Sequence, residues 1–281
     1  MVRVAEDVLV DVSDLFTDFD APFFAAGGVD TLRAVVDQRA AAGETRGLGG
    51  ERIGAPIARP HQIICVGLNY RKHAIESNMP IPDEPILFTK APNTLVGPDD
   101  DIWLPRGESK TDWEVELGIV IGRRSLYLDS DDAARAAIAG YVLSNDVSER
   151  AFQLERGGQW TKGKSSPTFN PCGPWLATAD EFENISDLDL WLEVNGDRYQ
   201  NGSTSDLIFD PIEIVKYISQ FMILEPGDLI NTGTPSGVGM GMTPQRWLHD
   251  GDTIELSISG LGVQHQNVIT TPSNPLGLTA P

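Results

Sequence analysis

Short apolar runs separated by turn residues dominate the chain from His61 onward, and they predict strands. Most runs end within a few residues at glycine, proline or asparagine, which is typical of strands rather than long helices. Asn195-Gly196 lies between two alternating runs and predicts a two-residue hairpin turn. The predicted strands lie within 63–70, 85–98, 112–122, 188–204, 226–239 and 250–269.

Three segments show helical features instead. Segment 29–42 repeats its apolar residues at helical spacing. Segment 129–148 begins as a predicted helix and continues as a strand near Gly140. Segment 210–224 begins with Asp210 as a helix N-cap and Pro211 at the first helical position. A strand-dominated core with a few short helices follows from these patterns, so we expect a mixed, β-rich α+β fold.

The first sixty residues differ from the rest of the chain. The predicted helix at 29–42 is followed by a segment rich in glycine and proline, 43–60, which is typical of a linker. We therefore expect a small N-terminal domain and linker in residues 1–60 and a larger domain in residues 61–281. The small domain is expected to pack beside the larger one.

Composition narrows the class of protein. The 281 residues include 21 Lys and Arg against 41 Asp and Glu, a formal net charge of −20, which disfavours binding to nucleic acid or anionic lipid. We find no apolar run long enough for a transmembrane helix, and the acidic first residues do not resemble a signal peptide. The two cysteines, Cys65 and Cys172, form neither a zinc pattern nor a disulfide framework, so a cytoplasmic location is expected.

Glu114 and Glu116 are the first candidates for chemistry. Residues two apart in a strand share a face, so the two carboxylates are expected to point the same way and to repel each other unless a cation lies between them. A half-exposed strand with a polar outer face would show the same alternation. The run that follows, 117–121, is apolar on both faces, which favours a functional role for the two acids.

Asp146 is a third acid at the end of an apolar strand. Together with Glu114 and Glu116 it would form a set of oxygen ligands, which suits Mg²⁺ or Mn²⁺. An isolated aspartate at a strand end is also typical of a turn or cap. The sequence alone does not show whether Asp146, thirty residues after Glu116, meets the other two.

Two further segments carry candidate residues. His73 and Glu76 are three residues apart, and on a helix such a pair makes contact, so Glu76 would orient the imidazole as a general base. A surface His–Glu pair would have the same spacing. Lys162 and Lys164 lie in a Gly-, Ser- and Pro-rich segment that predicts a loop. The glycine-rich segment 233–239 lacks the Gly-Lys-Ser/Thr ending of a phosphate loop, so we interpret it as a turn near a ligand.

Several motifs in order resemble the fumarylacetoacetate hydrolase family. They extend from about His61 to Val268 and comprise CVGLNYRKHAIE, PILFTKAPNTLVGP, DWEVELGIVIG, NDVSER, KGKSSPTF, GDLINTGTPSGVG and DGDTIELSISGLG. The resemblance implies a β-sandwich roll, a catalytic domain in residues 61–281 and a homodimer. Segments 155–175 and 237–252 look most like hydrolases of 2,4-diketo-3-deoxy-L-rhamnonate and L-fuconate.

The resemblance also implies a role for each candidate. The metal ligands of the family fall on Glu114, Glu116 and Asp146, and the water-activating pair falls on His73 and Glu76. The catalytic, active-site lysine of the family falls on Lys164, and two substrate contacts fall on Gln153 and Thr234.

The implied function is Mg²⁺-dependent (or Mn²⁺-dependent) hydrolysis of the C3–C4 bond of a 2,4-diketo acid. The products are pyruvate and a second acid, and the partner is a small anionic keto acid. Decarboxylation of oxaloacetate and isomerisation of an unsaturated diacid are alternatives on the same metal site. A metal-binding protein without turnover is an alternative from a different class.

Overall fold

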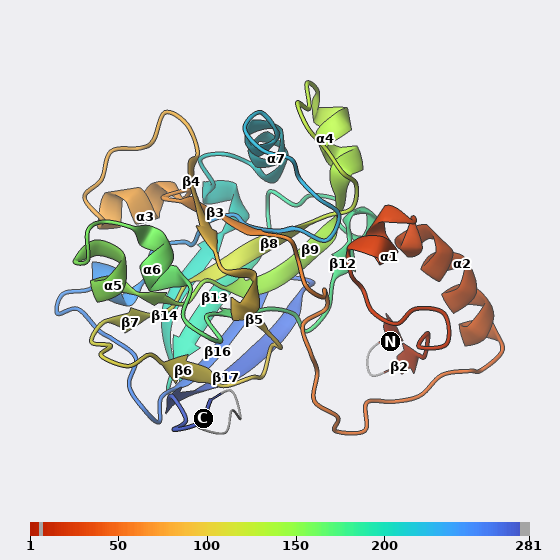
Figure 1. Cartoon of the computed structure of the whole chain (residues 1–281), viewed down its shortest axis with the longest axis horizontal. Coiled ribbons are helices and arrows are strands. Elements are labelled where there is room, and N and C mark those ends of the chain that lie inside the picture. The colour runs from red at the N-terminus through yellow and green to blue at the C-terminus, as the bar shows by residue number, and fades with distance from the viewer. Residues whose placement is uncertain (6–7, 276–281) are drawn as a thin grey trace, which may run out of the picture.

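Two β-sheets form the main body of the protein (Figure 1). The computed structural model describes residues 1–5 and 8–275; the last six residues of the predicted large domain lie outside this range. One sheet has six strands in the order β12-β9-β8-β15-β3-β4, and the other has five in the order β14-β13-β16-β17-β6. The bounds of the first are Ala177–Thr178, Ile138–Asn145, Val115–Ile121, Leu229–Asn231, Ile63–Gly67 and Ile86–Lys90. Those of the second are Asp197–Ser203, Asp189–Val194, Thr253–Ile258, Gly262–Thr270 and Ile102–Leu104.

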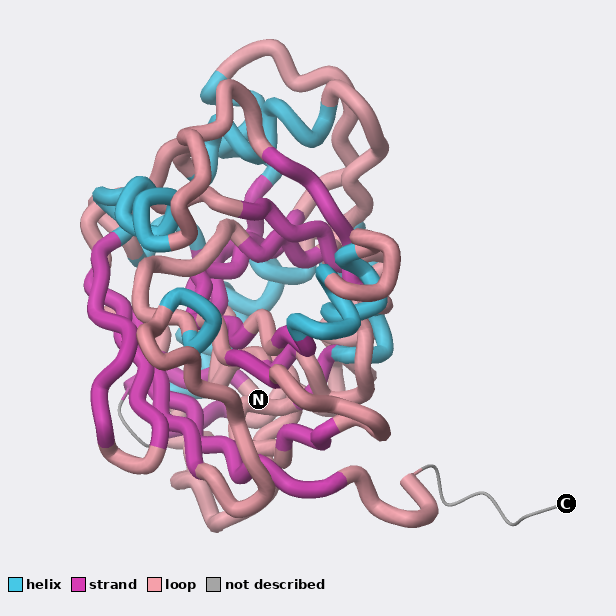
Figure 2. The backbone as a smooth tube through the Cα atoms, turned by 90° about the vertical axis from the view of Figure 1, so that its left-hand side faces the viewer, coloured by secondary structure: helices cyan, strands magenta, loops and turns pink. Residues whose placement is uncertain are grey.

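The described chain confirms the mixed, β-rich α+β class. Most of it is strand or loop, and the helices are short separate segments (Figure 2). They are α1 Ala21–Ala25, α2 Gly28–Ala41, α3 Arg71–Glu76, α4 Asp131–Ala137, α5 Arg150–Leu154, α6 Trp160–Lys164 and α7 Pro211–Ser219. None of the helices in residues 1–5 and 8–275 is both long and apolar enough to cross a membrane.

The predicted hairpin is confirmed at Asn195-Gly196. Strands β13 and β14 pair antiparallel with Val194 opposite Asp197, which leaves two residues for the turn. Asn195 and Gly196 have φ values of 54° and 83°, as a type I′ turn requires at both central positions. Asn-Gly is preferred there because both residues tolerate positive φ.

Strand β8 has two different faces. Its odd-numbered residues, Val115 to Ile121, join the core between the two sheets. Glu116, Gly118 and Val120 alternate with these residues and share the opposite face. Val120 belongs to a separate apolar cluster on that side. The same face therefore presents apolar residues at one end of the strand and carboxylates at the other.

The N-terminal segment packs on the apolar end of that face. Phe23 and Phe24 of α1 are buried against residues of β3, β8, β9 and β15, in line with the expectation that this segment packs beside the larger part. Burying each ring is worth about 1.5–3 kcal/mol. The segment also contains a strand pair that the sequence patterns missed, β1 Val2–Ala5 and β2 Val8–Val10.

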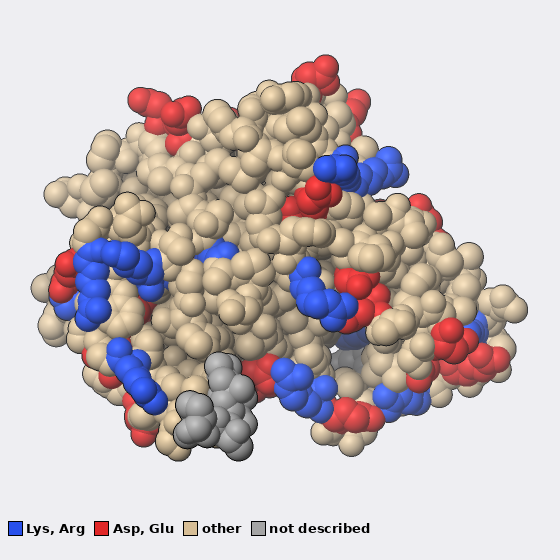
Figure 3. Space-filling model, viewed as in Figure 1, with Lys and Arg blue, Asp and Glu red and all other residues tan. Residues whose placement is uncertain are grey.

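Basic and acidic side chains lie next to each other over this N-terminal segment (Figure 3). Arg39 pairs with Asp14 at 2.7 Å, and Arg33 pairs with Asp180 at 2.5 Å. The second pair links α2 to the 3₁₀ turn Ala179–Glu181 after β12. Such exposed pairs contribute little stability, so the buried phenylalanines dominate the attachment.

Segment 160–164 corrects the loop predicted around Lys162 and Lys164, because it forms helix α6. Glycine suggested a loop, but Gly163 serves close packing of α6 on α5. A Cβ atom at this position would lie 2.5 Å from the Cβ of Gln153 and 2.5 Å from the carbonyl oxygen of Glu149. The glycine therefore allows contact between two helices rather than chain flexibility.

Both cysteines are free and buried, which leads to a simple prediction. Burial raises the pKa of the Cys172 thiol to about 12 and that of Cys65 well above its usual value. We expect iodoacetamide at pH 8 to leave both thiols unmodified in the native protein and to alkylate both after denaturation. Mass spectrometry measures the added mass, and rapid alkylation of the native protein would contradict this placement.

Candidate metal centre and active site

Three buried carboxylates meet at one end of strand β8. One oxygen each of Glu114, Glu116 and Asp146 lie within 4.8 Å of one another. The antiparallel register pairs Val115 with Asn145, so the flanking residues Glu114 and Asp146 lie side by side. The Asp146 backbone N–H donates to the Glu114 carbonyl oxygen at 2.9 Å. The register of β8 and β9 thus brings together the three acids that the sequence singled out.

Three buried cationic side chains surround this triad. Lys164 Nζ lies 2.7 Å from Glu114 Oε2 and 2.7 Å from Asp146 Oδ2. Lys90 pairs with the other oxygen of Asp146. Arg150 Nη2 lies 2.7 Å from the other oxygen of Glu114. Buried charges need such close partners because an unpaired charge away from water is costly.

Asp112 adds a fourth acid to the cluster. It lies in β7, Thr111–Asp112, which pairs with β10, Ser148–Glu149, directly before Arg150. Its Oδ2 atom lies 2.8 Å from Arg150 Nη2. With all four carboxylates ionised, the three cations leave a formal charge of −1 in the buried cluster. A divalent cation bound to these ionised carboxylates would make the formal charge +1, which suits a monoanionic ligand.

The surroundings shift the pKa values of this cluster in different directions. Burial, repulsion from Asp146 and repulsion from Glu114 hold the pKa of Glu116 well above its usual range. Burial alone would also raise the pKa of Glu114, but the charges of Lys164 and Arg150 outweigh it and lower that pKa. Burial opposes the charge of Lys164, yet Asp146 and Glu114 outweigh burial and raise its pKa. Lys164 is therefore a cation at neutral pH and not a proton acceptor.

His73 and Glu76 form the predicted pair on helix α3. His73 Nδ1 lies 3.1 Å from Glu76 Oε2, and both residues are largely shielded from solvent. The Gly237 N–H donates to Glu76 Oε1 at 2.9 Å. A carboxylate only accepts hydrogen bonds, so the proton between the two side chains lies on Nδ1, and in the neutral ring Nε2 is the atom left to accept a proton.

One glycine-rich loop connects this pair to the triad. Its first residue, Gly233, donates its N–H to Glu116 Oε2 at 2.7 Å, and Gly237 holds Glu76. Segment 233–239, which we interpreted from the sequence as a turn near a ligand, thus links the acidic triad to the His73–Glu76 pair.

The two predicted substrate contacts are buried next to these groups. The Thr234 hydroxyl donates to the Val115 carbonyl oxygen at 2.9 Å and accepts from Gln200 Nε2 at 2.7 Å. Gln153 Oε1 accepts from Arg150 Nη1 at 3.1 Å. Lys162, in contrast, is exposed and donates to the carbonyl oxygen of Arg156, away from the cluster.

The triad fits a hard divalent cation. Its donors are all carboxylate oxygens, which Mg²⁺ and Mn²⁺ prefer. Glu116 is buried beside Asp146 and Glu114, so burial and repulsion raise its pKa, and a cation would relieve that repulsion.

Sequence reasoning missed Lys90, Asp112 and Arg150. Each had a weak signal in the chain: Lys90 ends an otherwise apolar strand, Asp112 precedes Glu114 by two residues, and Arg150 follows Asp146 by four. A basic residue at the end of a buried strand indicates a buried ion pair, because a buried charge needs a partner of opposite charge.

Comparison with known proteins agrees with this geometry. The family model described as fumarylacetoacetate (FAA) hydrolase C-terminal matches residues 62–269. A 2,4-didehydro-3-deoxy-L-rhamnonate hydrolase from a Sphingomonas species is 51% identical over 221 residues, 78% of this chain and 77% of the relative. Maleylpyruvate hydrolase from a Sphingobium species, solved with manganese(II) and pyruvate, is 27% identical with a TM-score of 0.79, over 95% of both chains. A 2-hydroxyhepta-2,4-diene-1,7-dioate isomerase from Mycobacterium marinum is 38% identical with a TM-score of 0.68, covering 82% of this chain and 80% of the isomerase.

The fold and the buried acidic site therefore define an enzyme of the hydrolase and isomerase type. The chain belongs to the fumarylacetoacetate hydrolase family, as the matched region covers most of its length and includes every candidate site residue. Since relatives in this family carry both hydrolase and isomerase names, the reaction has to be argued from the site.

Proposed function

We propose that the protein is a metal-dependent hydrolase that cleaves the C3–C4 bond of a 2,4-diketo acid into pyruvate and a second acid. One observation carries this proposal: a buried, oxygen-only triad lies next to a His–Glu pair, and one glycine loop bonds to both. The triad suits a cation that binds a keto acid, and the pair suits the activation of water. The name of the Sphingomonas relative supports the same reaction class.

Mg²⁺ or Mn²⁺ is the proposed cofactor, held by Glu114, Glu116 and Asp146. When bound, it supplies a Lewis acid that polarises the 2-oxo group of the substrate. The manganese ion and pyruvate in the Sphingobium structure support this assignment.

His73 is the proposed general base. Its Nε2 atom takes a proton from water while Glu76 holds the ring through Nδ1. The water oxygen bonds to C4, and the C3–C4 bond then breaks with its electron pair moving onto the 2-oxo group as an enolate. The proton that His73 took from water is then delivered to C3, which completes pyruvate, and C4 leaves as the carboxyl group of the second acid.

Lys164 and Arg150 are the proposed electrostatic partners of the anionic substrate. Both are buried cations within 2.7 Å of Glu114, so they offset the negative charge of the acids. Gln153 and Thr234 have side chains held by hydrogen bonds near these groups, and we assign them to substrate contact. The high pKa of Lys164 favours charge stabilisation over proton abstraction.

The proposal is tested by Mg²⁺-dependent pyruvate release from a panel of acids. The panel contains acylpyruvates, oxaloacetate and 2,4-diketo-3-deoxy sugar acids, with EDTA-treated enzyme as the control. We expect the diketo-deoxysugar acids to react fastest, in line with the Sphingomonas relative. Pyruvate from oxaloacetate alone would replace the hydrolase by a decarboxylase, and no pyruvate from any acid would reject both.

Isomerisation of an unsaturated diacid is the second candidate. The His73–Glu76 pair can also move a proton between two carbon atoms, and the Mycobacterium marinum neighbour is named as such an isomerase. An absorbance change of a dienol diacid without pyruvate release would favour this candidate.

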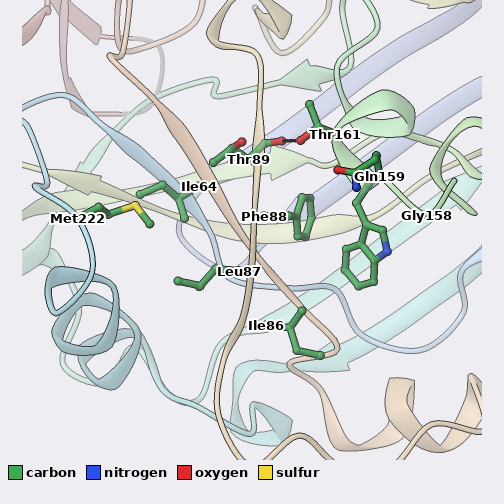
Figure 4. A pocket seen from close by; sticks show the side chains of 10 residues that line it. Ile64, Ile86, Leu87, Phe88, Thr89, Gly158, Gln159, Thr161 and Met222 are labelled. Atoms are coloured by element: carbon green, nitrogen blue, oxygen red, sulfur yellow. Dashed lines mark hydrogen bonds between the residues drawn. The ribbon is translucent and has the colours of Figure 1, made fainter.

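We further propose that the protein is a cytoplasmic homodimer with no nucleic-acid or membrane partner. Edge strand β4 lies beside a hollow of about 490 Å³, whose lining is polar as well as apolar (Figure 4). The hollow is lined in part by Ile64, Ile86, Leu87, Phe88 and Met222. Phe221, next to Met222 in the chain, is 63% exposed. An edge strand flanked by apolar side chains is a surface that a second copy can cover.

For the dimer, we expect light scattering at micromolar concentration to give twice the chain mass of 30.5 kDa. Replacing Phe221 with aspartate should shift the mass toward one chain, because a charge would be buried in the interface. A wild-type mass of one chain would contradict the dimer.

A further inference from the structure

Asp112 is a buried acid to which the proposed reaction gives no role. Its side chain is inaccessible to solvent, yet its two oxygens accept four hydrogen bonds. Oδ1 accepts the N–H groups of Gly239 at 2.7 Å and Trp113 at 2.9 Å. Oδ2 accepts the Met240 N–H at 3.1 Å and Arg150 Nε at 2.9 Å. One carboxylate thus binds both an arginine and a loop that lies far away in the sequence.

On one side, Asp112 reaches the metal triad. Arg150 donates from Nε to Asp112 at 2.9 Å, and its Nη2 forms ion pairs with Asp112 at 2.8 Å and Glu114 at 2.7 Å, so the guanidinium lies between the two acids. The guanidinium is planar, and its nitrogen atoms are fixed relative to one another. A displacement of Glu114 therefore changes the position at which Arg150 meets Asp112.

On the other side, Asp112 is connected to the His73–Glu76 pair through the 3₁₀ turn Gly239–Gly241. The preceding Gly237 N–H binds Glu76, and Gly241 packs directly on the Glu76 carboxylate. A Cβ atom at position 241 would lie 2.4 Å from Glu76 Cδ, and one at position 239 would lie 2.9 Å from Asp112 Oδ1. The turn is therefore fitted between the two acids without spare room.

We propose that Asp112 is a positioning residue that couples the metal triad to the His73–Glu76 pair. A cation that fixes Glu114 also fixes Arg150, and Arg150 fixes Asp112 and the two loop amides that Asp112 binds. Coupling between sites is reciprocal, so loss of Asp112 should weaken cation binding as well as loosen the loop. The catalytic consequence rests on the proposed function, whereas the coupling itself does not.

The first experiment uses Mn²⁺ alone and follows deuterium exchange in peptides that cover 238–241. We expect saturating Mn²⁺ to slow exchange there by about 5-fold or more in the wild type, the lower end of typical couplings. Gly233 is left out of the readout because it binds Glu116 directly. In Asp112→Asn, an amide donor faces either Arg150 or the loop N–H groups. We expect this variant to lose the Mn²⁺-induced protection and to bind Mn²⁺ about 5-fold more weakly.

Asp228→Asn is the matched control. Asp228 is equally buried and accepts the N–H groups of Gln62 at 3.0 Å and Glu225 at 2.8 Å, at the opposite end of β15 from Gly233. It should lower thermal stability and keep both the Mn²⁺ affinity and the protection of 238–241. If Asp228→Asn also lost the Mn²⁺-induced protection of 238–241, any buried Asp→Asn change would loosen the fold in the same way, and this would overturn the proposal.

Arg150→Lys is the second variant, for the case that Asp112→Asn does not fold. It keeps the charge and leaves the loop bonds of Asp112 in place, but a single ammonium replaces the bridging fork. We expect it to lose the Mn²⁺-induced protection too. Wild-type protection in either folded variant would overturn the proposal, as would a wild type whose loop does not respond to Mn²⁺.

Kinetics separate this inference from the proposed function. If the protein releases pyruvate, Asp112→Asn should lower kcat by about 10-fold or more and change KM less, because a misplaced base affects the transition state. If the protein releases no pyruvate, the exchange and Mn²⁺ measurements still decide whether the two groups are coupled. A change in KM alone would contradict the assignment of Asp112 to positioning.

Discussion

Replacing Glu116 with glutamine is expected to weaken divalent-cation binding strongly and leave the metal-free protein at least as stable as the wild type. Glu116 is buried beside Asp146 and Glu114, whose charges repel its own. Its carboxylate accepts the Gly233 N–H at 2.7 Å, and an amide oxygen still accepts that bond. The variant thus removes a charged ligand and a repulsion together, and Mn²⁺ affinity should fall by more than about 100-fold.

Thermal denaturation with and without Mg²⁺ measures both effects. A ligand that binds only the folded state raises the melting temperature by mass action, so the wild type should gain stability with Mg²⁺. Glu116→Gln should gain none. A variant that gains as much as the wild type would contradict the assignment of the triad to metal binding.

Asp146→Asn is the informative comparison with Glu116→Gln. Both variants remove one negative charge from the triad, but we expect Asp146→Asn to lower the stability of the metal-free protein. Both oxygens of Asp146 pair with buried lysines, Lys90 and Lys164. Removing one partner of a buried pair costs about 3–5 kcal/mol, since the other charge stays buried. We therefore expect a lower melting temperature in Asp146→Asn but not in Glu116→Gln.

Local patterns were enough to predict part of this site. Glu114 and Glu116 stood out through strand alternation, and His73 and Glu76 through helical spacing; the structure places each pair in contact range. The proximity of Asp146 to the two glutamates could not be predicted from local patterns, because it depends on the β8–β9 register, which tertiary packing sets. In the sequence, only the family resemblance places Asp146 beside them.

The buried ion pairs could not be predicted in this way. Asp112, Arg150 and Lys90 meet across elements that are distant in sequence, and no local period encodes such contacts. The loop predicted around Lys162 and Lys164 was wrong for a related reason: Gly163 lies in a helix, and its role is close approach rather than chain flexibility. These positions follow from three-dimensional packing, which sequence periodicity does not contain.

Replacing His73 with alanine is expected to separate hydrolysis from decarboxylation in one protein. Hydrolysis of a 2,4-diketo acid needs a base for water, and a positioned base contributes about 10²–10⁴-fold to the rate. Decarboxylation of oxaloacetate needs no attacking water, so its rate should fall much less. The measurement compares kcat for the two acids at saturating Mg²⁺, and it applies when the wild type acts on both.

Glu76→Gln gives the graded control for His73→Ala. The carboxylate accepts from both His73 Nδ1 and Gly237 N, whereas the amide has one oxygen for these two donors. If the oxygen keeps the Gly237 bond, the amide N–H₂ faces Nδ1 and favours the tautomer that blocks Nε2. We therefore expect an intermediate loss of hydrolysis and little loss of decarboxylation. Equal losses on both acids would mean that His73 serves binding or folding. Lys164 could not then take over as the base, because the acids around it raise its pKa and keep it protonated.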